Sequence, residues 1–187
     1  MRVTGGDSKG RRLAPLKGFS IRPTSDKVRE AVFNLIGQDV ARQRVLDLFS
    51  GTGGLGIEAL SRGASEAIFI DHALQAVTLI KKNLSICGYE NRGIVLKADL
   101  RRGLPSKDER MKNPFGLAFI DPPYGKDLIP PLLRDLCDKR ILAASSIIVA
   151  ETSKFDMLPE SYVRLRTRNV KTYGETKLTI YEYEDEQ

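Results

Sequence analysis

Apolar segments with the spacing of buried strands alternate with amphipathic helices along most of this chain. Strands that alternate with helices form parallel sheets whose two faces are both covered. We therefore predict an α/β fold with a mostly parallel sheet. The strands are expected at 44–49, 67–71, 94–99, 116–121 and 146–151, and the helices at 24–37, 54–64, 74–87 and 127–137.

The last part of the chain follows a different pattern. Residues 163–173 and 177–184 both alternate apolar with polar positions, and Gly174 lies between the two segments. Two alternating segments joined by a short turn that contains glycine indicate an antiparallel hairpin. We expect a sheet of seven strands, with helices on both faces and this hairpin at one edge.

The length of 187 residues suits a single domain at 1–187, without an internal repeat or a linker. Within it we expect a short basic arm at 1–23, a helix at 24–37 and the α/β core at 44–187. Residues 1–44 contain ten Lys and Arg against four Asp and Glu, an excess that equals the net charge of +6 of the whole chain. This distribution favours an anionic partner near the N-terminal arm.

Composition disfavours several other classes of protein. Cys87 and Cys137 are the only cysteines and His72 is the only histidine, so we expect neither a disulfide framework nor a metal site. The first residues lack the apolar segment of a signal peptide, and no apolar run approaches the length of a membrane span. We expect a cytoplasmic protein with no membrane partner.

A glycine-rich turn follows the first strand. Residues 51–56 read GTGGLG, the G-x-G-x-x-G pattern of dinucleotide-binding turns, and Asp71 ends the second strand twenty positions after Gly51. Asp47 lies four residues before Gly51, where its negative charge opposes a bound pyrophosphate. A cofactor without phosphate and with positive charge, such as S-adenosylmethionine, is compatible with an acid there.

The residues at the ends of the first three strands are the expected cofactor contacts. Gly51 and Gly53 let the backbone approach the amino-acid end of the cofactor, Asp71 accepts from the ribose hydroxyls, and Asp99 accepts from the adenine amino group. As an alternative, each aspartate caps the turn or helix that follows it. The predicted cofactor-binding set is Thr24, Asp47, Ser50, Gly51, Gly53, Asp71, Asp99 and Leu100.

The fourth strand ends in the sequence FIDPPYG at residues 119–125. Pro122 and Pro123 have no N–H, so the carbonyls beside them are available to a ligand instead of a neighbouring strand. Asp121 and the Pro122 carbonyl are placed to accept the two N–H bonds of a planar amine, and Tyr124 is placed to stack on its ring. The alternative is an ordinary strand that ends in a Pro-Pro turn.

These motifs together resemble a known group of enzymes. VLDLFSGTGGLGIEALSRGA at 45–64 and FIDPPYG resemble the class I S-adenosylmethionine-dependent methyltransferases that modify exocyclic amines. MRVTGGDSKGRRL at 1–13 and IRPTSDKVREAVFNLIG at 21–37 resemble the bacterial 16S ribosomal RNA guanine-N2 methyltransferase family.

The resemblance covers nearly the whole chain and implies a Rossmann-like class I fold with 44–187 as the catalytic core. It also implies S-adenosylmethionine as the cofactor and the N2 atom of one guanine of 16S rRNA as the methyl acceptor. The catalytic residues implied are Asp121, Pro122 and Tyr124.

The resemblance also gives the basic arm a partner. Positive side chains interleaved with Gly, Ser and Pro suit contact with RNA phosphates. The RNA is expected either free or within the small ribosomal subunit. The predicted RNA contacts are Lys9, Arg11, Arg12, Lys17 and Arg22.

Two other functions stay open on the sequence. A DNA adenine-N6 or protein-glutamine methyltransferase is one, because the Asp-Pro-Pro-Tyr turn suits those amines equally well, but no target-recognition segment is inserted. A non-catalytic RNA-binding protein with the same fold is the other. It is disfavoured because all four strand-end acids are present: Asp47, Asp71, Asp99 and Asp121.

Overall fold

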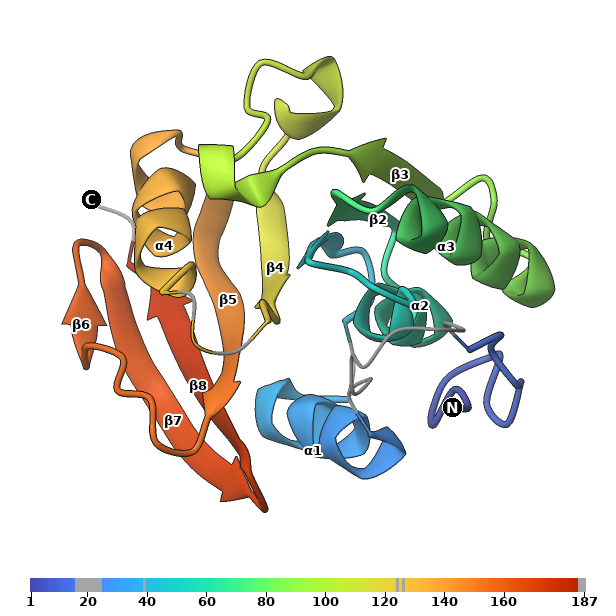
Figure 1. The fold of residues 1–187 in the computed structure, drawn as a ribbon, viewed down its shortest axis with the longest axis horizontal. Coiled ribbons are helices and arrows are strands. Elements are labelled where there is room, and N and C mark those ends of the chain that lie inside the picture. The colour runs from blue at the N-terminus through green and yellow to red at the C-terminus, as the bar shows by residue number, and fades with distance from the viewer. Residues whose placement is uncertain (16–24, 39, 124, 126, 185–187) are drawn as a thin grey trace.

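A computed structural model describes residues 1–15, 25–38, 40–123, 125 and 127–184 (Figure 1). Its centre is an eight-stranded sheet with the order β3-β2-β1-β4-β5-β8-β7-β6. Strands β1 to β5 pair in parallel, and β8, β7 and β6 continue the sheet in antiparallel pairs. The strands are β1 (Arg44–Leu48), β2 (Glu66–Asp71), β3 (Gly93–Lys97), β4 (Phe115–Ile120), β5 (Leu142–Ser153), β6 (Ser161–Tyr162), β7 (Leu165–Tyr173) and β8 (Thr176–Tyr183).

The predicted α/β fold and its C-terminal hairpin, formed by β7 and β8, are confirmed. The sheet has one strand more than the seven expected, because β6 adds a pair to the outer edge of β7. A strand of two residues has no alternation that a sequence pattern could reveal. The helices are α1 (Asp26–Ile36), α2 (Gly54–Ser61), α3 (Leu74–Cys87) and α4 (Ile129–Asp138), with single 3-10 turns η1 (Leu100–Arg102) and η2 (Glu109–Met111).

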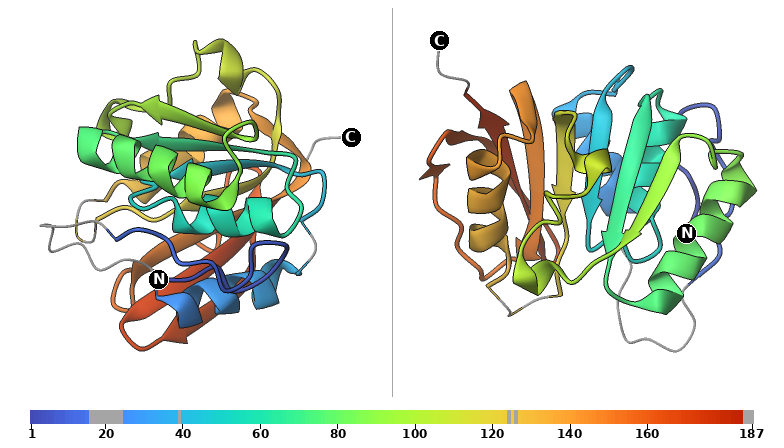
Figure 2. Two further views of the ribbon diagram at one scale, coloured as in Figure 1. Left: turned by 90° about the vertical axis from the view of Figure 1, so that its right-hand side faces the viewer. Right: turned by 90° about the horizontal axis from the view of Figure 1, so that it is seen from above.

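The helices are divided unequally between the two faces of the sheet (Figures 1 and 2). Apolar residues of α1, α2 and α3 share one buried cluster with alternate strand residues such as Val45 and Phe119. Apolar residues of α4 share a second cluster with the strand positions in between, such as Leu46 and Ile120. Because successive strand residues point to opposite faces, the parallel strands β1 to β5 contribute to both clusters. Strands buried on both faces explain the continuous apolar runs in the sequence.

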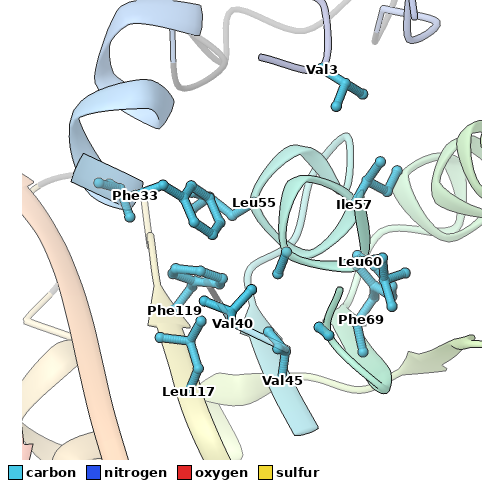
Figure 3. Packing of buried hydrophobic residues seen from close by; sticks show 14 of the residues in the cluster. Val3, Phe33, Val40, Val45, Leu55, Ile57, Leu60, Phe69, Leu117 and Phe119 are labelled. Carbon is cyan, nitrogen blue, oxygen red and sulfur yellow. The ribbon is translucent and has the colours of Figure 1, made fainter. Parts of the chain in front are cut away.

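The first cluster is centred where α1 and α2 meet the middle strands (Figure 3). Phe33 of α1 packs edge-on against Phe119 of β4, with ring centroids 5.9 Å apart. Both rings are completely buried. This contact holds α1 over the sheet, next to the residue positions at which β4 ends.

Local signals at the helix ends agree with the structure. The Ser25 hydroxyl accepts a hydrogen bond from Val28 N at 3.2 Å and caps α1. Gly37 follows α1 with a φ of 105°, a conformation that favours glycine. Pro130 lies in the first turn of α4, where a missing N–H costs no helical hydrogen bond.

The described part of the basic arm, residues 1–15, forms a hairpin-like loop that packs on α2 and α3. Arg2 and Arg12 form an antiparallel bridge, and Val3 and Leu13 are buried in the first core cluster. Asp7 N and Ser8 N donate to Ser61 O and Ser61 Oγ, at 2.9 and 3.0 Å. The arm is therefore part of the packed structure.

A buried polar network joins this arm to α1 and α2. Glu58 is completely buried, and its carboxylate accepts hydrogen bonds from Thr4 N at 2.8 Å and Thr4 Oγ1 at 2.7 Å. Arg62 pairs with the same carboxylate at 2.8 Å, and the completely buried Arg29 approaches it at 3.5 Å. Arg29 also donates to the Arg2 carbonyl. Loss of one partner of a buried ion pair lowers the stability of the fold more than loss of a partner at the surface, because the remaining charge stays buried without compensation.

Gly56, the last glycine of GTGGLG, allows α2 to approach β1 and β2 closely. A Cβ atom at this position would lie 2.3 Å from Phe69 Cε1 and 3.0 Å from Asp47 Oδ2. Gly56 N donates to Asp47 Oδ2 at 2.9 Å. The absence of a side chain therefore fixes both the packing of α2 and the position of the Asp47 carboxylate.

We expect Gly56→Ala to lower the free energy of unfolding by about 1–3 kcal/mol or more, because the added methyl overpacks a closed part of the core. Chemical denaturation measures this loss. Gly54→Ala in the same helix is the control, since its Cβ would meet the flexible end of Met1 at 3.2 Å. Equal stability of the two variants would contradict the close-approach role of Gly56.

Candidate active site

The site lies where the order of the strands reverses. The chain proceeds from β1 outward to β2 and β3, then returns to form β4 on the other side of β1. In open α/β sheets the crevice outside the carboxyl ends of the strands at such a point binds ligands. A cavity of about 900 Å³ opens there, lined by the ends of β1, β2, β4 and β5, by the start of α1 and by the β7–β8 turn.

Asp47 projects from β1 toward this cavity and is almost completely buried. Burial raises the pKa of its carboxyl to about 7, and the nearby Asp121 and Asp71 carboxylates add to this effect. The hydrogen bond from Gly56 N opposes the rise. An acid held in this way gains most from a bound cation, which compensates the charge that burial and its neighbours disfavour.

Asp71 ends β2 and holds the glycine-rich turn. Its Oδ2 accepts a hydrogen bond from Gly51 N at 3.0 Å, and its Oδ1 accepts one from Ala73 N at 2.9 Å. The capping role considered as an alternative is thus present in this structure. Asp71, Gly51 and Ser50 nevertheless line the cavity together.

Two residues of the turn act mainly on its shape. Ser50 Oγ donates to the Asp47 carbonyl at 2.5 Å and accepts from Ile70 N at 2.9 Å, so it fastens the end of β1 to β2. Gly53 has a φ of 77° and caps α2. It is absent from the cavity lining in the described part of the chain.

Asp99 and Leu100 follow the end of β3 and do not line the described part of the cavity. The Asp99 carboxylate caps η1 through Arg101 N at 3.1 Å and pairs with the Arg101 guanidinium at 2.7 Å. These hydrogen bonds to Arg101 lower the pKa of Asp99 to about 2. Leu100 is buried in the cluster under α4. Neither residue belongs to the described lining, so the contact of Asp99 with adenine and that of Leu100 with the cofactor stay predictions.

Asp121, Pro122 and Pro123 line the cavity on the side of β4. Asp121 N donates to the Leu48 carbonyl at 3.5 Å, so the pairing of β4 with β1 extends to the first residue of the motif. Asp121 and Asp47 project toward the same cavity from neighbouring strands, near enough for their charges to interact. Tyr124 lies outside the described residues.

The sequence reasoning missed residues from the C-terminal half of the sheet. Glu151 near the end of β5, Tyr173 at the end of β7 and Thr176 at the start of β8 all line the cavity. Glu151 follows the apolar run SIIVA, which is the same signal that singled out Asp121 after GLAFI. Tyr173 and Thr176 had no such signal in the sequence. The β7–β8 turn reaches the cavity because β8 pairs with β5, and a local sequence pattern does not show which strands pair.

Asn83 is a further residue that sequence reasoning missed. It is completely buried in α3, and its side-chain amide donates to the Thr52 carbonyl at 2.9 Å. The Asn83 side-chain oxygen Oδ1 accepts a hydrogen bond from Ala14 N at 2.8 Å. One polar side chain therefore joins the glycine-rich turn to the N-terminal arm.

The charge of the cavity is opposite to that of the chain. Its described lining contains five acids and one lysine, Lys27, although the chain carries a net charge of +6. A negative pocket of this kind repels phosphate groups and attracts cations. The acids are Asp47, Asp71, Asp121, Glu151 and Glu175.

The described residues of the arm that were predicted to bind RNA are all exposed. Arg11 Nη1 donates to the Ile86 carbonyl at 2.7 Å, near the end of α3, so part of its role is structural. The side chains of Lys9 and Arg12 make no hydrogen bond to the described residues of the chain. Lys17 and Arg22 lie outside the described residues.

The described residues form neither a reactive thiol site nor a metal site. Cys87 and Cys137 are both buried, and burial raises the pKa of both thiols. No group of three or more His, Cys, Asp or Glu side chains is arranged to hold a metal in this part of the chain. None of its helices combines the length and the apolar character that a membrane crossing requires.

The fold and the site define a class of protein. A sheet with the strand order 3-2-1-4-5, an antiparallel hairpin beyond it, a glycine-rich turn after β1 and an acid at the end of β2 are the features of class I methyltransferases. The chain belongs to the family described as conserved hypothetical protein 95, whose model matches residues 1–182.

Named relatives and solved structures agree with this assignment. The chain is 40% identical to "Putative rRNA methyltransferase YlbH" of Bacillus subtilis over 97% of this chain and 98% of that protein. It is 31% identical to "Ribosomal RNA small subunit methyltransferase D" of Haemophilus influenzae, over 97% and 93% of the two chains. The solved structure of "Putative methyltransferase yhhF" from Escherichia coli superposes with a TM-score of 0.84, at 29% identity, over 100% and 99% of the two chains.

The raised pKa of Asp47 predicts how stability depends on pH. The carboxyl keeps its proton up to about pH 7 when folded but loses it near pH 4 when unfolded, so this group costs stability as pH rises through that window. The full difference corresponds to a cost on the order of 4 kcal/mol. We expect Asp47→Asn to remove this cost and to flatten the decline of the melting temperature between pH 5 and pH 8.

Asp108→Asn is the control for this measurement. Its hydrogen bonds to Arg110 lower the pKa of Asp108 to about 2, so its carboxyl is ionised in both states throughout the same window. Its removal should leave the slope unchanged. Parallel profiles for the native chain and Asp47→Asn would contradict the assignment of a raised pKa to Asp47.

Proposed function

We propose that this protein transfers a methyl group from S-adenosylmethionine to the exocyclic N2 of a specific guanine in small-subunit (16S) ribosomal RNA. The observation that carries the proposal is the Asp121-Pro122 turn, which opens at the end of β4 into a cavity lined by acids. The names of the relatives support ribosomal RNA of the small subunit as the substrate.

The cavity fits the proposed cofactor in charge and size. S-adenosylmethionine carries a positive sulfonium and a positive ammonium group and no phosphate. Asp47 and Asp71 provide negative charge beside the glycine-rich turn, and about 900 Å³ is ample for a ligand of this size. In this proposal Gly51 N and the Asp47 carboxylate lie near the amino-acid end of the cofactor, and Asp71 accepts from its ribose. Thr24, predicted as a further contact, lies outside the described residues.

In the proposed reaction the main role of the protein is to orient the reacting groups. When bound, S-adenosylmethionine supplies a methyl group on a positively charged sulfur, which the amine nitrogen attacks in line. The N2 atom of guanine is a weak nucleophile because its lone pair is delocalised into the ring. Acceptors that hold both N–H bonds direct the nitrogen lone pair toward the methyl group and contribute through positioning.

Asp121 and the Pro122 carbonyl are the acceptors in this proposal. Asp121 is half-buried and Pro122 is buried, so both lie at the inner end of the turn. The product amine carries a positive charge until it loses a proton, and it is acidic enough to give that proton to Asp121 or to water. We assign the stacking of the guanine ring to Tyr124 on the resemblance alone.

The N-terminal arm provides the proposed RNA contact. Its exposed side chains Lys9 and Arg12 project from a hairpin that packs on α2 and α3 beside the site. A guanine in folded RNA must leave its stack to reach the cavity, which costs a few kcal/mol. Phosphate contacts by a fixed arm offset that cost. We propose that the substrate is 16S rRNA, free or in the assembling or assembled small subunit.

Nucleoside analysis tests the proposed function directly. We expect 16S rRNA from cells that lack the gene to lose one N2-methylguanosine, and purified protein with S-adenosylmethionine to restore it in small subunits from those cells. Mass spectrometry of digested rRNA measures both results. Normal N2-methylguanosine content in the deletion strain, or restoration of a different modified nucleoside, would refute the assignment.

Asp121→Ala tests the role of the turn. We expect single-turnover methyl transfer to fall on the order of 10²-fold, because one positioned acceptor is lost at the reacting amine. Cofactor affinity by calorimetry and the melting temperature should stay close to those of the native chain. Asp138→Ala removes an exposed acid at the end of α4 and should retain full turnover. Native turnover in Asp121→Ala would show that the turn is structural.

The arm is tested by the salt dependence of RNA binding. We expect the double variant Lys9→Ala, Arg12→Ala to weaken binding and to reduce the slope of log affinity against log salt by about 2, one for each lost phosphate contact. The variant Arg110→Ala, Lys112→Ala removes the same charge in and beside η2, in the yellow-green loop at the top of Figure 1 and away from the arm. An equal change in slope for both variants would indicate a general effect of net charge.

A further inference from the structure

Glu151 holds a position beside Asp121 that the proposed reaction leaves without a role. Ile120 of β4 pairs with Ala150 of β5, so Asp121 and Glu151 are the next residues on two adjacent parallel strands. Adjacent strands lie about 4.8 Å apart. Both residues line the cavity.

The two acids also share a face of the sheet. Phe119 and Val149 belong to the core cluster under α1, and residues two positions further along a strand project to the same side. Asp121 and Glu151 therefore extend this face past the last core residues. Asp47 of β1 lies on the same face, in register with Phe119.

Glu151 is a buried carboxylate at the wall of the acidic cavity. Its exposed fraction is 6%, and it faces a cavity that already contains Asp47, Asp71 and Asp121. Thr176 Oγ1 lies 3.5 Å from Glu151 Oε1, at the limit of a hydrogen bond. A buried carboxylate at the wall of a cavity can accept a strong, charge-assisted hydrogen bond from an N–H group of a substrate that enters the cavity.

We propose that Glu151 accepts the N1–H of the target guanine and so determines that guanine is the base that is methylated. This inference rests on the proposed function. On its Watson–Crick edge guanine presents N1–H directly beside the N2 amine. With the amine held by Asp121, the neighbouring donor faces the next strand, where Glu151 provides the acceptor.

This arrangement distinguishes guanine from the other bases that carry an exocyclic amine. Beside the N6 amine of adenine and the N4 amine of cytosine, the Watson–Crick ring nitrogen is an acceptor. A carboxylate opposite an acceptor gains no hydrogen bond and repels its lone pair. Asp-Pro-Pro turns suit all three amines, so the acid of the adjacent strand provides the discrimination that the turn lacks.

The test compares two bases in the same RNA position. Small subunits are assembled on 16S rRNA that carries either guanine or 2-aminopurine at the methylated position. 2-Aminopurine keeps the N2 amine but has an acceptor at N1. We expect the native enzyme to prefer guanine in kcat/KM by roughly 100-fold, as for loss of a hydrogen bond to a charged group.

Glu151→Gln should reduce that preference by at least about 10-fold, because its amide can donate to N1 of 2-aminopurine and no longer carries a charge. The missing O6 of 2-aminopurine affects both enzymes and cancels in the comparison of the two ratios. A merely structural role would lower turnover on both substrates equally. The ratio is informative even if the variant is less stable.

Thr152→Val is the matched control, since this buried residue is the next on β5 and projects to the opposite face. It should keep the native preference. If the native enzyme methylates guanine N2 but Glu151→Gln keeps the native ratio, the specificity role of Glu151 is refuted and the proposed function stands. If the native enzyme transfers no methyl to guanine, both are refuted.

Discussion

The close contact between α2 and β1 determines the geometry of everything at the carboxyl ends of the strands. Gly56 permits it, because a methyl group there would overlap the Phe69 ring, and the Gly56 N–H binds the Asp47 carboxylate at 2.9 Å. The same contact directs the glycine-rich turn over the end of β1, where Gly51 N reaches Asp71. The positions of Asp47 and Asp71 thus depend on the close approach of α2 to the sheet, which the missing side chain of Gly56 permits.

The N-terminal arm depends on this helix in turn. Glu58 lies on α2 and binds Thr4, while Arg62 and Arg29 approach its carboxylate from the same helix and from α1. Asn83 connects the arm to the glycine-rich turn. A basic segment that sequence analysis treated as an arm is therefore held rigidly beside the cavity. Rigid attachment lets phosphate contacts contribute to orientation as well as to affinity.

Two opposite electrostatic environments follow from this arrangement. Four of the five exposed charged residues in the described part of the arm are basic, while the cavity that it borders is lined by five acids and one lysine among the described residues. Positive charge outside suits a polyanionic substrate, and negative charge inside suits a cationic cofactor and the N–H groups of a base. Burial, and after it the neighbouring Asp121 and Asp71 carboxylates, raises the pKa of Asp47 to about 7 in a chain of net charge +6.

The sequence alone determined the α/β fold, the hairpin and the acids at the ends of β1, β2 and β4, because periodicity and turn residues act over a few neighbouring positions. Only the tertiary structure decided which strand ends meet. It brought Glu151 beside Asp121 and the β7–β8 turn into the cavity. These relations depend on strand order, on register and on side-chain contacts between segments far apart in the chain, which no local pattern encodes.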